Sequence, residues 1–196
     1  MCNLDIATRV MLNKVGLDPD KDVSIVAVGS LENRMAALLN GAIDGGVAQP
    51  PDQLALEDKG FHVLYDLAAQ KLPSVGTAVV VQRSWLNGNK DVAQRYIDSL
   101  VQAVAKSRSN KELAMTVLQK YLKNDDQRAL GVTYDFFVGQ VTPQYPLIKP
   151  EQFTDALKYL SASNEKIKDF DLSTILDNSF AQSAFDRKVG GPVAGP

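Results

Sequence analysis

Residues 23–49 contain the pattern that most constrains the fold of this chain. A run of β-branched and apolar residues at 23–28 leads into Gly29-Ser30, then into a segment at 31–40 whose apolar residues recur with helical spacing. A glycine and a second apolar run follow. β-Branched runs favour strands, and a glycine after a helix favours its end. The pattern predicts a strand–turn–helix–strand unit, with its polar turn at the sheet edge where open α/β sheets bind ligands.

The same reasoning divides the chain into a part with strands and a part made of helices. In the first part we expect helices at 4–16 and 52–59, and further strands at 42–48, 61–67 and 76–82. From residue 84 onward the apolar spacing is helical in five segments, at 92–104, 113–122, 130–138, 153–160 and 175–185. We therefore predict an α/β fold with a helix-rich C-terminal half.

Composition excludes several classes of function. The net charge is −2 and the Lys and Arg residues are scattered, which argues against a nucleic-acid partner. No apolar run is long enough to span a bilayer, and residues 1–20 lack the apolar core of a signal peptide. Cys2 and His62 are the only cysteine and histidine, so we expect no disulfide, no metal site, no cofactor and no catalytic triad. His62 is expected to face solvent.

Polar residues near the predicted turns are the candidate ligand contacts. The turn after the first strand can supply backbone N–H groups and the positive end of a helix dipole, which suits an anionic or strongly polar ligand. Each candidate also has an ordinary structural role to set against binding: a helix cap, a surface turn or the start of a strand. The predicted ligand-binding residues are Asn3, Asp5, Gly29, Ser30, Gln49 and Thr77. The directions of Arg9 and Arg34 are left open.

Five segments together resemble one family. The chain is similar to the periplasmic solute-binding proteins of ABC transporters in the nitrate/sulfonate/taurine and thiamine-precursor (NMT1-like) group. One match is Arg34–Asp44, which reads Arg-Met-Ala-Ala-Leu-Leu-Asn-Gly-Ala-Ile-Asp; its Ala-Leu-Leu-x-Gly-Ala-Ile-Asp element, residues 37–44, is fairly specific in combination. The other matches are the Ala7–Leu17 helix with its Asp-Pro-Asp-Lys-Asp-Val continuation, Gln49-Pro50-Pro51, Phe61–Asp66 and Asp91–Ile97.

The resemblance implies a truncated periplasmic-binding-protein-like (type II) fold that lacks the N-terminal part of lobe one. Residues 1–75 would form a βα lobe resembling lobe two, and residues 76–83 a hinge strand. Residues 84–189 would be the helical portion of lobe one, and 190–196 a disordered tail. In that layout a small polar or anionic molecule would be held in an interlobe cleft.

The resemblance also implies partners and a location. A non-catalytic, periplasmic or otherwise extracytoplasmic protein would pass its solute to an ABC permease, and the truncated lobe favours a homodimer. Two alternatives remain open: a ligand-sensing regulatory domain of the same fold, and an enzyme resembling a pyrimidine-precursor synthase. The role of Cys2 is also open, between an incidental thiol and a lipoprotein anchor.

Overall fold

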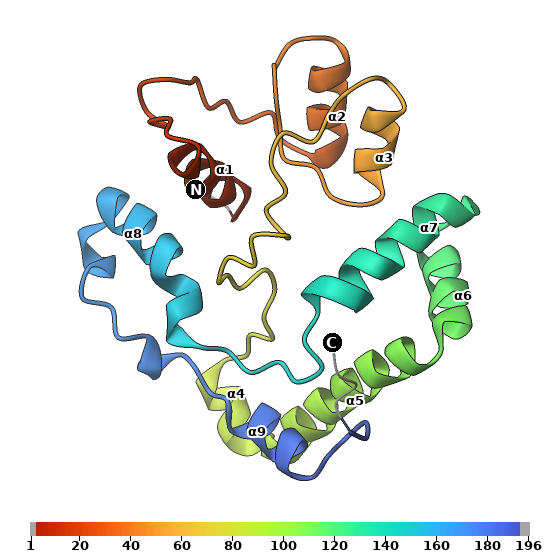
Figure 1. Ribbon diagram of the computed structural model, residues 1–196. Coiled ribbons are helices and arrows are strands. Elements are labelled where there is room, and N and C mark those ends of the chain that lie inside the picture. The colour runs from red at the N-terminus through yellow and green to blue at the C-terminus, as the bar shows by residue number, and fades with distance from the viewer. Residues whose placement is uncertain (1–2, 193–196) are drawn as a thin grey trace. The chain divides into compact units, whose positions relative to one another are not determined.

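The structure, a computed structural model, describes residues 3–192. The chain divides into two compact units, which are described separately below (Figure 1). Unit 1 consists of Met1–Leu72 and Asp155–Glu165, and unit 2 of Pro73–Thr154 and Lys166–Pro196. Cys2 and residues 193–196 of the predicted tail lie outside the described residues.

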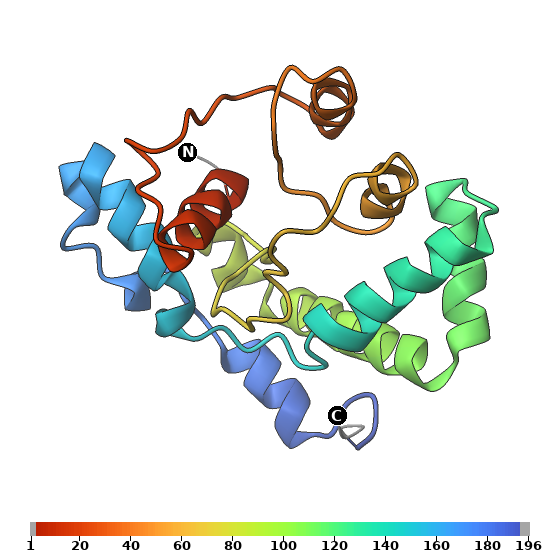
Figure 2. The same cartoon turned by 45° about the horizontal axis from the view of Figure 1, so that its top comes forward.

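Unit 1 is built from short helices joined by extended chain. Its helices are α1 (Asn3–Lys14), α2 (Leu31–Leu39), α3 (Asp52–Glu57) and nearly all of α8 (Thr154–Ser163). Helices α2 and α3 pack together, and the amide of Asn13 on α1 donates a hydrogen bond to the Tyr159 hydroxyl on α8 at 2.7 Å. Both ribbon views show α8 beside α1 (Figures 1 and 2). The distant segment 155–165 is thereby joined to the N-terminal part of the chain.

Unit 2 contains the longest helices. They are α4 (Arg83–Gly88), α5 (Lys90–Ser109), α6 (Lys111–Leu122), α7 (Gln127–Tyr134) and α9 (Ser179–Asp186). A π-helical segment, η1 (Asp135–Val141), continues α7, and 3-10 turns η2 (Pro150–Phe153), η3 (Glu165–Ile167) and η4 (Leu172–Thr174) lie before and after α8. Helix α5 packs against α9 and α6, and α6 packs against α7.

The core of unit 2 lies along α5. Val101 is fully buried there, together with Tyr145 and with Ala184 of α9. The Tyr145 hydroxyl donates to the carbonyl of Val189 at 3.0 Å, so this buried side chain also meets its polar requirement. Leu130, on α7, is also fully buried.

Local capping explains where several helices begin. The Asn110 side chain accepts a hydrogen bond from the Leu113 N–H at 2.9 Å at the start of α6. At the start of α7 the Asp126 carboxylate accepts from the N–H groups of Arg128 and Ala129. Such caps satisfy N–H groups that have no partner inside the helix. These helix starts therefore depend on neighbours in the sequence.

The predicted α/β fold is wrong, and with it the type II binding-protein architecture. No residue in 3–192 belongs to a β-strand. The segments predicted as strands, 23–28, 42–48, 61–67 and 76–82, contain no helix and consist of turns, bends and irregular chain. A strand exists only when a neighbouring strand accepts and donates its backbone hydrogen bonds, and no such neighbour is placed beside these segments. The domain boundaries drawn from that fold remain predictions.

The predicted helices agree with the structure better than the predicted strands do. Expected helices at 4–16, 52–59, 92–104 and 113–122 overlap α1, α3, α5 and α6, and the other expected helical segments likewise contain observed helices. None of the helices in the described part of the chain is both long and apolar enough to cross a membrane. The helical spacing of apolar residues was therefore a more reliable predictor of structure than the β-branched runs.

Candidate functional site

Unit 1 contains a small cavity between the start of α1, the start of α2 and the chain before α3. Its volume is about 120 Å³, and Leu4, Leu31, Arg34, Val47, Ala48 and Gln49 line it. The lining comes from three stretches that are separate in sequence and contain, or directly adjoin, predicted ligand contacts. The cavity is the candidate functional site.

Arg34 and Gln49 supply the polar side chains of this cavity. In the described part of the chain, the Arg34 guanidinium has no hydrogen bond or ion pair, although the residue is half-buried. Its aliphatic stem passes Gly46, where a Cβ atom would lie 3.4 Å from the Arg34 Cδ. The site therefore presents an uncompensated cation beside a carboxamide, and the apolar wall of Leu4, Leu31 and Val47 would strengthen an electrostatic contact made there.

Ser30 has a structural role at the start of α2. Its hydroxyl oxygen accepts from the Asn33 N–H at 3.3 Å, and a hydrogen bond between Ser30 and Glu32 lowers the pKa of that carboxyl group. Gly29 precedes it with φ of +84°, a conformation that favours glycine. Both residues are exposed. They set the position of Leu31 at the cavity wall, while the Ser30 side chain is committed to the helix cap.

Asp5 is also engaged by a neighbour. Its carboxylate lies 3.3 Å from the Arg9 Nε, and Arg9 Nη1 lies 2.7 Å from Asp20. The two carboxylates, Asp20 first, raise the pKa of Arg9. Asp5 therefore helps to join α1 to the turn at Asp20, and Leu4, between Asn3 and Asp5, is the residue of this stretch that lines the cavity.

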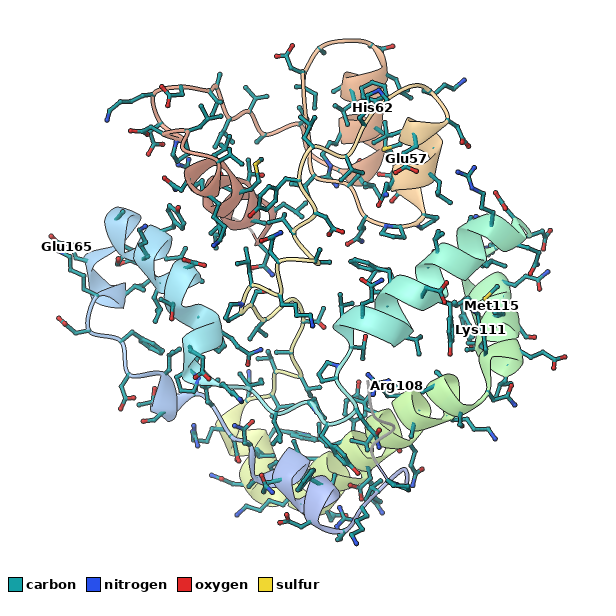
Figure 3. The ribbon with its side chains drawn as sticks, viewed as in Figure 1. Glu57, His62, Arg108, Lys111, Met115 and Glu165 are labelled. Atoms are coloured by element: carbon teal, nitrogen blue, oxygen red, sulfur yellow. The ribbon has the colours of Figure 1, made fainter. Side chains whose placement is uncertain are left out.

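Thr77 is not among the lining residues. It belongs to unit 2, where it is exposed in the extended segment before α4. His62, labelled in Figure 3, is exposed, as expected from the sequence. Of the six predicted contacts, Gln49 alone lines the cavity, and the binding role of all six remains a prediction.

A larger cavity, of about 610 Å³, lies in unit 2 at the C-terminal end of α5. Its most basic residues are Lys106 and Arg108, the latter labelled in Figure 3. Arg108 already donates to the carbonyls of Val138 at 3.3 Å and Thr142 at 2.6 Å. Lysine and arginine also compensate the negative end of a helix dipole. These contacts give the two basic residues structural roles, and the cavity makes a weaker ligand site than its size indicates.

Residues 3–192 contain no candidate metal site. No group of three or more His, Cys, Asp or Glu side chains there is arranged to hold a metal ion. The polar groups of the cavity in unit 1 are a guanidinium and a carboxamide, which bind and orient oxyanions and do not act as nucleophiles. The site thus fits the class of small-molecule binding proteins.

Comparison with known proteins agrees with this class. The model of the NMT1-like family matches residues 2–120, which include unit 1 up to Leu72 and the start of unit 2. The chain belongs to the NMT1-like family, as its sequence motifs predicted. The family consists mostly of non-enzymatic solute-binding proteins. No curated protein and no solved structure matches the chain.

Arg34 is the site residue that sequence reasoning did not assign. It is the first residue of the family segment Arg34–Asp44 and precedes the more specific part of that segment, residues 37–44. The sequence contained one usable signal: Arg9 has Asp5 at helical i−4 spacing, whereas Arg34 has no acidic residue three or four positions away in the helix 31–40. The spacing of acidic residues within each helix therefore distinguishes the two arginines.

Proposed function

We propose that the chain is the solute-binding component of an ABC importer and captures a small anion in the cavity of unit 1. The observation that carries this proposal is the half-buried Arg34 guanidinium, without a partner in the described residues and next to Gln49. Charge-assisted hydrogen bonds from arginine to an oxyanion are among the strongest in proteins. Family membership supports a solute as the ligand.

Cavity size narrows the ligand class. A volume of about 120 Å³ is well below the roughly 300–1,000 Å³ typical of pockets for drug-sized ligands. It suits the head of a small oxyanion, such as nitrate, a sulfonate or the sulfonate group of taurine. In this proposal Arg34 binds the charged oxygens and the Gln49 amide fixes their orientation. A pyrimidine-precursor-like molecule is a less good fit, because it lacks the negative charge that Arg34 would select.

The proposed partner and location follow from the importer role. A membrane permease would receive the bound solute, and the protein would work in the periplasm or another extracytoplasmic space. No catalytic step is proposed, since the cavity presents no nucleophile and no acid–base pair among the described residues. Nothing in the geometry favours a sensory domain over a transport component.

Isothermal titration calorimetry with nitrate, methanesulfonate and taurine tests the proposal. We expect one of these anions to bind the wild-type chain and Arg34→Gln to weaken that binding by about 10- to 100-fold, since a charged hydrogen bond contributes roughly 1.5–3 kcal/mol. The matched control is Arg95→Gln, because Arg95 is an exposed arginine of unit 2 whose ion-pair partner among residues 3–192 is Asp91 on its own helix. Equal binding by Arg34→Gln and wild type would disprove the site, and no binding of any anion would disprove the function.

A further inference from the structure

The segment Thr77–Val81 leaves its backbone without partners. No hydrogen bond of the described residues involves the N–H or C=O groups of these five residues. Val80 is 86% exposed, and Val79 and Val81 are 49% and 44% exposed. An apolar segment outside any helix, with unused backbone donors and acceptors, offers a surface to which another strand can add.

Charge indicates what kind of strand can pair with it. Residues 74–82 read Ser-Val-Gly-Thr-Ala-Val-Val-Val-Gln and contain no charged side chain, with Lys71 and Arg83 as the nearest cations. A parallel pair of identical segments would place Arg83 beside Arg83 and Lys71 beside Lys71, which is unfavourable. An antiparallel pair separates these cations, so the segment is complementary to a second copy of itself in that orientation.

One antiparallel register gives the longest uncharged overlap. With Val79 opposite Val79, the pairs are Ala78 with Val80, Thr77 with Val81, and Gly76 with Gln82. Arg83, the first residue of α4, then lies at the end of the pair opposite Val75, and Lys71 lies beyond the paired segment, so that no two cations face each other. Branched side chains at four of the five positions from 77 to 81 also suit strand packing.

We propose that two copies of the chain associate through an antiparallel pair of Thr77–Val81 segments centred on Val79. The partner strand would satisfy backbone groups that the single chain leaves unused and would cover the exposed valines. The association is independent of the anion proposed for unit 1, since none of these residues lines that cavity. The two proposals can therefore fail separately.

Disulfide trapping tests the register directly. In a Cys2→Ser background, Val79→Cys places two thiols directly opposite, with Cβ atoms roughly 4.5–5.5 Å apart, whereas two copies of Ala78→Cys lie on a diagonal at roughly 7–8 Å. Diamide accepts the two electrons and two protons released when the thiols form a disulfide. We expect several-fold more covalent dimer from Val79→Cys than from Ala78→Cys. Equal trapping of the two variants would overturn the proposed register.

Sedimentation velocity tests the association without a new disulfide. The wild-type chain is expected to sediment at twice its chain mass, and Val80→Lys at the mass of one chain, because the added charges oppose pairing. Leu64→Lys is the matched control: Leu64 is 92% exposed in an extended segment of unit 1. A monomeric wild type overturns the proposal, and so does a dimer that Leu64→Lys abolishes and Val80→Lys retains. Circular dichroism of each variant checks that its helices remain.

Discussion

Helix α5 and the segment Thr77–Val81 follow each other closely in the sequence, and both are rich in apolar residues. Helix α5 runs for 20 residues, forms its own backbone hydrogen bonds and buries Val101 completely. The segment Thr77–Val81 forms no backbone hydrogen bond within the described residues and leaves Val80 86% exposed. A helix satisfies its backbone hydrogen bonds within its own segment, whereas a strand needs hydrogen-bond partners from another segment.

The two regions also differ in what their side chains contribute to stability. Burial of a valine or leucine side chain stabilises a fold by roughly 1.5–3 kcal/mol, and an exposed one contributes little. The helices of unit 2 therefore account for more of its stability than the extended chain that precedes them. This difference can be measured with matched substitutions.

The largest expected effect is that of Leu130→Ala. Leu130 is fully buried on α7, so the substitution removes apolar contacts and leaves a cavity, and we expect a loss of about 2–5 kcal/mol in the free energy of unfolding. Urea unfolding followed by circular dichroism measures it. The comparison variant, Val80→Ala, should change the same quantity by less than about 0.5 kcal/mol in dilute, monomeric protein. Equal losses in the two variants would show that Leu130 and Val80 contribute equally to the stability of unit 2.

A smaller effect is expected at the start of α2, in unit 1. Ser30→Ala removes the side chain that accepts from the Asn33 N–H, and loss of an N-cap costs about 1 kcal/mol. Ser30→Asp should retain the cap and most of the stability. Thermal unfolding of both variants, with anion titrations alongside, separates the two roles of the residue. A Ser30→Ala chain that unfolds like wild type but no longer binds anion would show that Ser30 is a ligand contact and not chiefly a cap.

The smallest effect is expected for the ion pair between α5 and the residue after α9. The Arg187 guanidinium donates to Asp98 at 2.6 and 2.9 Å and is the main cause of the lowered pKa of that carboxyl group. A carboxyl whose folded pKa is lowered stabilises the fold above its unfolded pKa, and this contribution is lost as the pH falls through the folded value. Asp98→Asn should therefore lower stability at pH 7 by less than about 1 kcal/mol, because the Arg187 side chain is 46% exposed and solvent weakens the ion pair.

Acid denaturation checks the sign of this prediction. The difference between wild type and Asp98→Asn should shrink below about pH 4, where the unfolded carboxyl, with its ordinary pKa of 3.8, takes up a proton first. Urea unfolding at pH 7 and at pH 3 measures the two differences. A difference that grows on acidification would mean that the Arg187 contact does not stabilise the charged carboxylate.

Three stretches singled out from the sequence contribute to the cavity of unit 1, and their role in binding remains a prediction. Gln49, and the stretches around Asn3–Asp5 and Ser30, do converge on one cavity because each adjoins the start of a helix in unit 1. The cation in that cavity, Arg34, was not assigned. To choose Arg34 over Arg9 as the ligand-binding cation, one must know that Arg9 is paired with Asp5 and Asp20. Asp20 lies 11 residues from Arg9 along the chain.

The family, most of the helices and several of the caps that begin them follow from local sequence alone. These features depend on residues a few positions apart, which interact whatever the rest of the chain does. Two features depend instead on the tertiary structure: the apolar runs at 23–28 and 76–82 form no sheet, and Arg34 is the available cation of the cavity. Strand pairing and the neutralisation of a charge both depend on groups distant in sequence, and no local pattern records where those groups lie.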